Sequence, residues 1–172
     1  MTEDSKKIIF EVDDLENDDE ISLTAYMRVL VFFVGQEQYC VDIKDAKEVI
    51  KVEHVTHVPG VPNFVLGVMN LRGEVITLCD LCSFLTLDAS ERPKELWALV
   101  TDVLGAPMAL LVDEVKGAID IEERLIQPPL ATLGTKMSQY TRGQAQVGGE
   151  ILIFLDLKKI LTCEEMEHLK KG

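Results

Sequence analysis

Residues 59–85 read PGVPNFVLGVMNLRGEVITLCDLCSFL, and this stretch decides how the rest of the chain folds. Two apolar runs rich in β-favouring residues, 64–69 and 75–79, flank the turn residues Asn70-Leu71-Arg72-Gly73. A glycine at the end of such a turn supplies the positive φ that a tight hairpin bend requires. Asp80 follows, where its side-chain oxygen can cap a short helical turn. The stretch therefore predicts a hairpin with an arginine at its tip and a capped helical turn behind it.

Length and hydropathy limit the kind of protein that this chain can be. Its 172 residues fit one ordinary domain, or two very small ones that share a core. Hydrophobic residues make up 47% of the chain, but no run approaches the roughly 18 consecutive apolar residues of a membrane span. The start does not resemble a signal peptide, so we expect a cytoplasmic protein. Its four cysteines are then expected to be free thiols.

The charge of the chain is strongly acidic and unevenly spread. The net charge is −13, and residues 1–27 hold nine acids and two lysines, which gives −7 for that segment. A surface of this sign is repelled by a phosphate backbone, so nucleic-acid binding is not expected. An acidic segment with few aromatic residues is typical of a solvated chain, and residues 1–27 are predicted to form a disordered arm.

The second half of the chain repeats the first. Residues 64–85 align without gaps on residues 140–161, at an offset of 76, and the opening strands align at an offset of 69. The change in offset indicates a seven-residue insertion within residues 127–139. The identical pairs of the ungapped block are Gly67/Gly143, Gly73/Gly149, Glu74/Glu150, Asp80/Asp156, Leu81/Leu157 and Leu85/Leu161.

The repeat predicts an all-β fold of two five-stranded antiparallel β-barrels that share one hydrophobic core. The first copy would span about residues 28–86 and open with a hairpin, and the second would span about 95–163. The polar segment 87–94 is the expected linker, and residues 164–172 are expected to form a tail or a short helix. Strands that are apolar on both faces, such as 75–79, would fill a barrel with one face and pack on the sister barrel with the other.

Comparison of the two copies separates structural residues from candidate functional ones. Residues that both copies keep, such as Gly67 and Asp80, are explained by the fold alone. Arg72 aligns with Gly148, so the second copy makes the same turn without an arginine. An exposed arginine on a rigid turn suits recognition of a carboxylate or a carbonyl group in a partner. Arg72 is therefore the first candidate for a binding residue.

Signals for catalysis or metal binding are weak. Cys79 and Cys82 have the spacing of a redox pair, although the repeat places Cys79 in the core and Cys82 at the surface. His54 and His57 lie on an extended segment, where odd spacing directs the two rings to opposite faces. The chain contains no phosphate-loop, nucleophile-elbow or zinc-protease motif. We therefore expect no enzyme, no metal and no cofactor, and keep a thiol redox protein using Cys79 and Cys82 as an alternative.

Several motifs together carry a resemblance to a known family. GVMNLRGEVITLCDL, residues 67–81, resembles the central motif of the CheW-like family, whose usual form reads near GVINLRGxVIPVIDL. Residues 39–43 (YCVDI) and 46–50 (AKEVI) are similar to its YxxDI and VxEII segments. The likeness continues through LVDEV (111–115), QPP (127–129) and LDL (155–157), so it covers about residues 28–163.

The resemblance implies a non-catalytic adaptor with a fold of two five-stranded barrels. Members of the family couple the cytoplasmic tips of methyl-accepting chemotaxis receptors to the regulatory domain of the CheA histidine kinase in two-component signal transduction. Carried over by motif position, the receptor-binding residues would be Ile43, Ala46, Glu48 and Arg72. The kinase-binding residues would be Lys51, Val55, Thr56 and Gly67. An alternative is the same module serving a non-chemotaxis kinase system, such as pilus motility.

Three positions depart from the family pattern. Thr77 stands where proline is usual, Cys82 where arginine is frequent, and Ala46 replaces a larger aliphatic residue at the expected receptor groove. These departures bear on the details of receptor contact rather than on membership of the family. The sequence shows no receiver domain after the module, so we do not expect one of the two-domain CheV relatives.

Overall fold

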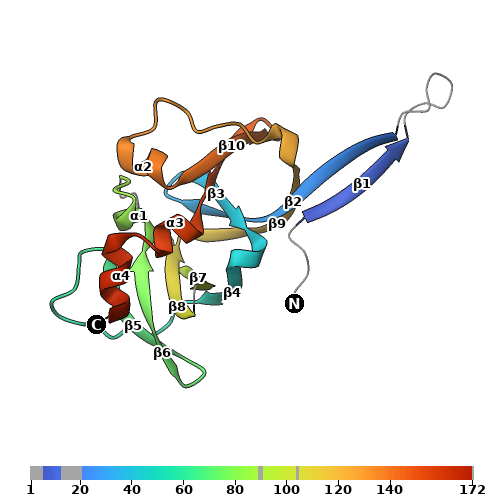
Figure 1. Ribbon diagram of the computed structural model, residues 1–172. Helices are drawn as coiled ribbons and strands as arrows, with labels where there is room; N and C mark the ends of the chain where they lie inside the picture. The colour runs from blue at the N-terminus through green and yellow to red at the C-terminus, as the bar shows by residue number, and fades with distance from the viewer. Residues whose placement is uncertain (1–5, 13–20, 89–90, 104, 172) are drawn as a thin grey trace.

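The computed structural model describes residues 6–12, 21–88, 91–103 and 105–171, and most of its regular structure is β-strand (Figure 1). The strands of the first half are β1 (Lys6–Val12), β2 (Ile21–Val34), β3 (Glu37–Asp42), β4 (Ala46–Lys51), β5 (Val65–Leu71) and β6 (Glu74–Asp80). Those of the second half are β7 (Trp97–Val103), β8 (Ala106–Val112), β9 (Glu114–Glu122), β10 (Thr141–Val147) and β11 (Glu150–Leu155). The helical segments are short: η1 (Ile43–Asp45), α1 (Leu81–Phe84), η2 (Glu123–Leu125), α2 (Thr135–Gln139), α3 (Leu157–Leu161) and α4 (Glu164–Lys171).

The strands form two sheets that exchange elements between the sequence repeats. One sheet has the order β1-β2-β3-β11-β10 with β9 on the other edge of β2, and the second has the order β4-β7-β8-β6-β5. Each sheet thus combines the opening hairpin of one copy with the three closing strands of the other. The parallel pairs β3·β11 and β6·β8 join the two contributions, and every other pair is antiparallel. The prediction of two five-stranded units is confirmed, but their assignment to residues 28–86 and 95–163 is wrong, since the chain crosses to the other sheet after β3 and after β8.

A glycine in each five-stranded unit allows the two ends of the sheet to approach each other. The ends of the two sheet paths meet in single bridges, where Thr56 and Val68, and likewise Gln127 and Gln144, exchange backbone hydrogen bonds of 2.8 and 2.9 Å. Beside each bridge stands a glycine, Gly67 or Gly143, whose added Cβ would overlap the carbonyl oxygen of Thr56 or Gln127. This overlap is the physical reason why both copies keep glycine there.

The hydrophobic core has three parts. One cluster consists of side chains on one face of the first sheet: Met27, Val29, Val31, Cys40, Ile121, Ala145, Leu152 and Phe154. A second cluster consists of side chains on one face of the other sheet: Met69, Ile76, Leu78, Ala98, Val100, Ala109 and Leu111. The third and largest cluster lies between them and includes Phe32, Cys79, Leu99 and Leu155. On β6, Ile76 and Leu78 belong to the cluster of their own sheet, whereas Cys79 belongs to the shared cluster. This confirms the predicted packing of β6 on both faces.

The acidic arm differs from its prediction. Lys6–Val12 pairs with the first half of β2 in a register that joins Lys6 to Met27 and Val12 to Ile21. Residues 6–12 and 21–27 are therefore strands of a two-stranded ribbon that projects from the two sheets (Figure 1), and not a disordered arm. The runs KKIIFEV and ISLTAYM carry enough β-branched and aromatic residues to pair despite the surrounding acids. Residues 1–5 and 13–20, which complete the predicted arm, lie outside the described residues.

The central hairpin is tighter than predicted. Leu71 pairs with Glu74, so the turn consists of Arg72 and Gly73 alone, with φ values of 52° and 89°. Two successive residues with positive φ are the signature of a type I′ hairpin turn. The side-chain oxygen of Asn70 accepts a hydrogen bond of 3.0 Å from the backbone N–H of Gly73 and so supports the turn. The second copy makes the same turn with Gly148 and Gly149, at φ values of 60° and 83°.

Candidate partner-binding surface

Arg72 and Glu48, two of the predicted receptor-binding residues, meet in a bidentate ion pair. The two terminal nitrogens of the Arg72 guanidinium donate to the two Glu48 oxygens over 2.7 and 2.6 Å. The Arg72 side chain is 71% exposed, so the pair lies at the surface. The hydrogen bonds from Arg72 lower the pKa of the Glu48 carboxyl, which therefore stays ionised. The pair joins the tip of the β5–β6 hairpin to strand β4 and presents a fixed charged group.

Arg72 has a backbone conformation that glycine adopts more easily than any other residue. Its φ of 52° lies in the left-handed region, which side chains with a Cβ rarely adopt. At the equivalent turn position the second copy has Gly148, with a φ of 60°. The turn conformation therefore does not require an arginine, and the strained backbone of this residue points to a role for its side chain.

Ile43, Ala46 and Glu48 follow one another along η1 and β4. All three are half-buried, and Ile43 and Ala46 pack against the shared core. The pairing of β4 with β7 shifts between Ala46 and Glu48, so Lys47 is an extra residue in the strand. Lys47 reaches Asp102 at 3.8 Å. The four predicted receptor-binding residues thus lie on η1, an edge strand and the hairpin tip that is tied to it.

The predicted kinase-binding residues lie farther along the chain, and one of them is not accessible. Lys51 is at the end of β4 and pairs with Glu95 at 3.0 Å, while Val55 and Thr56 are exposed beyond it. Gly67 is buried, and its backbone packs against Thr56. Gly67 can therefore affect a partner through the shape of the Thr56 segment, but it offers no contact group of its own.

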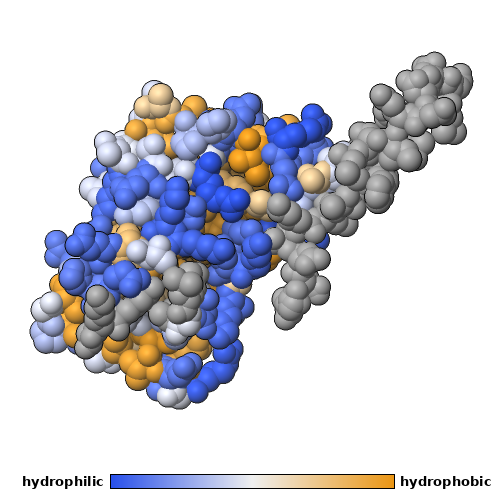
Figure 2. All heavy atoms as spheres, in the orientation of Figure 1, coloured by the Kyte–Doolittle hydropathy of each residue, from blue (hydrophilic) through white to orange (hydrophobic). Residues whose placement is uncertain are grey.

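An apolar hollow adjoins Thr56 and was not anticipated. Its lining comes from the 58–62 loop, from β5 and β6, and from α4: Val58, Gly60, Val61, Pro62, Val65, Val68, Thr77, His168 and Leu169. Hydrophilic residues cover much of the face shown in Figure 2, and hydrophobic residues gather at its lower end, near the β5–β6 hairpin of Figure 1, with smaller groups near the top. Thr77, one of the departures from the family pattern, lines this hollow. The contribution of α4 was not predictable, because the charged sequence EEMEHLKK carries little signal for packing.

Cys79 and Cys82 do not have the properties of a redox pair. Cys79 is fully buried, and burial raises the pKa of its thiol to about 12. Burial and the Asp80 carboxylate also raise the pKa of Cys82, whereas a reactive thiol needs a lowered pKa. Both cysteines are free thiols. The geometry gives the redox alternative no support.

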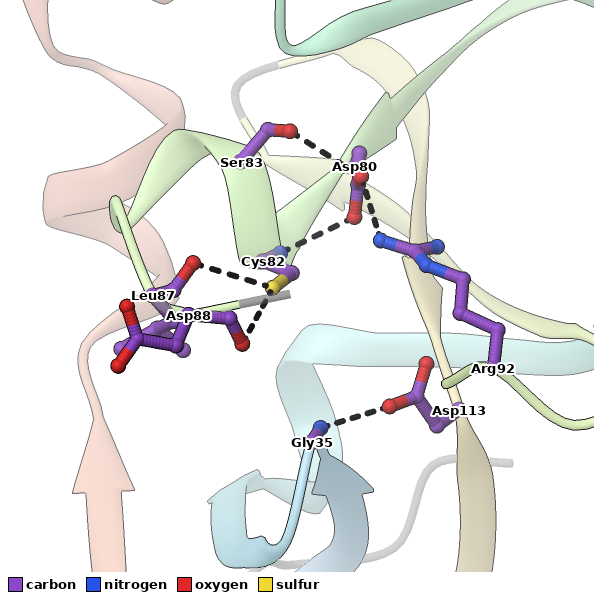
Figure 3. A network of polar contacts seen from close by, with 8 residues as sticks. All are labelled: Gly35, Asp80, Cys82, Ser83, Leu87, Asp88, Arg92 and Asp113. Atoms are coloured by element: carbon purple, nitrogen blue, oxygen red, sulfur yellow. Dashed lines mark hydrogen bonds and ion pairs between the residues drawn. The ribbon is translucent and has the colours of Figure 1, made fainter. Parts of the chain in front are cut away.

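The prediction that Cys82 lies at the surface is wrong, because the expected linker folds back over it (Figure 3). The Cys82 thiol lies 3.7 Å from the carbonyl oxygen of Leu87 and 3.9 Å from that of Asp88. Asp80 holds this arrangement, since it accepts hydrogen bonds from the backbone N–H of Cys82 over 3.1 Å and from Arg92 over 2.6 Å. Asp80 thus caps α1, as predicted, and also anchors the linker through Arg92.

Replacement of Arg92 by alanine is expected to loosen the linker and expose Cys82. Asp80 would lose a charge-assisted hydrogen bond, and we expect the free energy of unfolding to fall by about 2 kcal/mol. Urea denaturation measures this loss, and Ellman's reagent under native conditions should label one further thiol. The double variant R92A/C82S is the control, because it should lose that extra label while keeping the lower stability. Unchanged labelling of R92A would contradict the role given to Arg92.

The described part of the chain offers neither a metal site nor a membrane-crossing helix. His54 and His57 are both exposed, and no group of three or more His, Cys, Asp or Glu side chains in residues 6–12, 21–88, 91–103 and 105–171 could hold a metal ion. Among the helices in these same ranges, none combines the length and apolar character needed to cross a membrane.

Comparisons with known proteins agree with the motifs and the fold. The model of the CheW-like domain matches residues 28–165. The chemotaxis protein CheW of Rhizobium meliloti (strain 1021) is 30% identical over 139 residues, which cover 81% of this chain and 90% of that protein. The crystal structure of the scaffolding protein TtCheW from Thermoanaerobacter tengcongensis superposes with a TM-score of 0.72 at 28% identity, covering 80% of this chain and 89% of that one. Protein PilI of Pseudomonas aeruginosa (strain PAO1) is 35% identical over 86 residues, 50% of this chain and 48% of PilI.

Proposed function

Since the chain belongs to the CheW-like domain family, we propose that it is a non-catalytic adaptor that couples methyl-accepting chemotaxis receptors to a CheA-type histidine kinase. It would act in the cytoplasm, where it binds the receptor tips with one surface and the regulatory domain of the kinase with another. The family match, and a similarity to CheW proteins over about four-fifths of this chain, support the adaptor function. The assignment of each surface to a partner rests on the residues discussed next.

The receptor-binding surface is assigned to Ile43, Ala46, Glu48 and Arg72. The observation that carries this assignment is an arginine at a turn position that glycine fills in the second copy, with its guanidinium held beside Glu48 by two hydrogen bonds. Arginine retains unused donors when it pairs with one carboxylate, so a receptor carbonyl or carboxylate could bind the same group. Ile43 and Ala46 would add an apolar contact beside this charged pair.

The kinase-binding surface is assigned to Lys51, Val55 and Thr56, together with the apolar hollow next to them. Val55 is a large hydrophobic residue with 39% exposure, and exposed apolar groups beside a hollow are a common feature of protein interfaces. Gly67 is buried beneath this surface, and its lack of a Cβ allows the Thr56 segment to pack against β5.

Titration calorimetry against the regulatory domain of a CheA-type kinase from the same organism tests the kinase half of the proposal. We expect saturable binding with a dissociation constant of about 10 μM or lower. The variant Val55→Asp should weaken binding at least about tenfold, because it places a charge in the apolar contact. Ile151→Asp, at an exposed residue of β11 outside this surface, is the matched control and should leave binding unchanged. Absence of binding to such a domain would refute the proposed kinase partner.

A second candidate is the same module in a pilus-motility system, which the similarity to PilI suggests. That similarity covers half of each chain, whereas the similarity to CheW proteins covers four-fifths of this one or more. Calorimetry against the kinases of both systems from the same organism would distinguish the two functions, because the kinase of the true system should bind more tightly.

A further inference from the structure

Equivalent sites lie at the ends of the two parallel strand pairs. In the first sheet, β3 and β11 run side by side with Cys40 opposite Phe154. η1 follows Cys40 and α3 follows Phe154 after the same number of residues, so both helical turns begin at one edge of the sheet. In the second sheet, β8 and β6 run side by side with Ala109 opposite Leu78, and Asp113 and α1 follow in the same way. The sequence repeat therefore builds one kind of site twice.

In the second sheet this site is acidic, and the linker fills it. Backbone carbonyl groups of residues 87–88 cover the thiol of Cys82 on α1 (Figure 3). Arg92 of the same linker donates to the Asp80 carboxylate over 2.6 Å, and the Asp113 carboxylate also attracts it. A segment that carries one cation thus occupies a site that is lined by two carboxylates.

In the first sheet the equivalent site has the opposite charge and no such cover. At the offsets of the repeat, Lys44 stands in the position of Asp113, and Lys158 in that of Cys82. Arg142 is an extra residue at the same end of β10, where the pairing with β11 shifts. Cys82 is buried, whereas Lys158 is exposed, because the chain continues from α3 into α4 and does not fold back as the linker does.

The three basic side chains lie together and are open to solvent. Burial and the neighbouring Asp42 raise the pKa of the Asp45 carboxyl. The charges of Lys158, Lys44 and Arg142 act in the opposite direction, so all three lie near this carboxyl. Within the described residues, none of the three forms an ion pair with a carboxylate. One carboxylate near three cations leaves an excess of positive charge, which can attract an anion.

The repeat and the charge together identify what would bind there. The other copy builds the same edge without these cations, so the fold does not require them. Even without residues 1–27, which contribute −7 of the net charge of −13, the chain is acidic and would repel a long phosphate polymer. A short segment with a few carboxylates needs only the local cations. We infer that Lys44, Arg142 and Lys158 form a docking site for an acidic segment of a protein partner, in the place that the linker occupies in the other sheet.

This docking site goes beyond the proposed receptor and kinase contacts. Lys44 lies between Ile43 and Ala46 in the chain, so the site adjoins the proposed receptor-binding surface. It shares none of the four residues assigned to that surface. The inference therefore stands whether or not a receptor binds at Arg72, and its test needs no receptor.

A synthetic peptide tests the inference with the full chain. The probe is a fluorescent peptide of about eight residues, half of them glutamate, and its control has glutamine in place of every glutamate. Binding is followed by fluorescence anisotropy in a buffer of low ionic strength, where charge attraction is least screened. We expect saturable binding of the glutamate peptide, at least about tenfold tighter than that of the glutamine peptide. Equal binding of the two peptides, or no binding of the glutamate peptide, would overturn the inference.

Two variants with the same change in net charge locate the binding. K44Q/K158Q removes two exposed cations of the site and should weaken binding of the glutamate peptide about fivefold or more. K94Q/K116Q removes two exposed lysines elsewhere and should change binding less than about twofold. An equal effect of the two variants would overturn the inference. So would tighter binding of a single-stranded oligonucleotide of the same charge that K44Q/K158Q weakens.

Discussion

Replacement of Arg72 by glycine is expected to abolish receptor coupling while leaving the protein fully folded. Glycine adopts the left-handed conformation at no steric cost, and Gly148 already fills the equivalent position of the second hairpin. The melting temperature of R72G should therefore equal or exceed that of the original chain. Binding to receptor-containing membranes should fall at least about tenfold, because the guanidinium supplies the charged group of the surface.

Two companion variants separate the role of Arg72 from that of its ion pair with Glu48. Glu48→Gln keeps the shape of the side chain and removes the charge, so Arg72 loses its ionised partner but stays on the turn. If Arg72 contacts the receptor itself, E48Q should weaken binding less than R72G does. Arg72→Lys keeps the positive charge but removes the planar guanidinium. The decrease in receptor binding by this variant would measure how much the bidentate contact contributes. An unfolded R72G, or full receptor binding by R72G, would refute the assignment.

Replacement of Gly67 by alanine is expected to be the most destabilising single change in this structure. A Cβ at this position would overlap the Thr56 carbonyl oxygen, and the φ of 148° is unfavourable for any residue but glycine. We expect the free energy of unfolding to fall by about 3 kcal/mol or more, which lowers the melting temperature by about 6–12 °C. Differential scanning calorimetry measures this shift directly.

Gly134→Ala is the matched control for that substitution. Gly134 has a φ of −62°, and an added Cβ there meets no heavy atom within 4 Å. Its stability should therefore change by less than about 0.5 kcal/mol. Gly143→Ala, at the equivalent closure of the other sheet, should reproduce the loss seen in G67A. A melting temperature of G67A equal to that of G134A would contradict the role given to Gly67 beside the Thr56–Val68 bridge.

Much of the local structure, although not the β1–β2 ribbon, could be predicted from the sequence. The hairpin around Arg72 and Gly73, the cap provided by Asp80 and the two-sided packing of β6 depend on neighbouring residues, so their pattern is visible in one stretch of chain. The internal repeat also predicted two five-stranded units. It could not show that the copies exchange hairpins, because either pairing of opening hairpin and closing strands buries the same apolar residues.

The contacts of the candidate site depended on tertiary structure. Arg72 and Glu48 are 24 positions apart and on different elements, so no local pattern predicts their ion pair. Cys82 was expected at the surface, since the sequence repeat aligns it with a charged residue, Lys158, but the linker that covers Cys82 follows only the first copy. Gly67 was assigned to kinase binding by motif position, although its occurrence in both copies already indicated a structural role, which the overlap with Thr56 explains.

Co-sedimentation of three purified components tests the adaptor function most directly. Vesicles that carry a methyl-accepting chemotaxis receptor from the same organism are mixed with its CheA-type kinase and then centrifuged, with and without this chain. We predict that the kinase sediments with the receptor vesicles when the chain is present and stays largely in the supernatant when it is absent or replaced by R72G. Equal sedimentation of the kinase with and without the chain would contradict its function as a coupling adaptor.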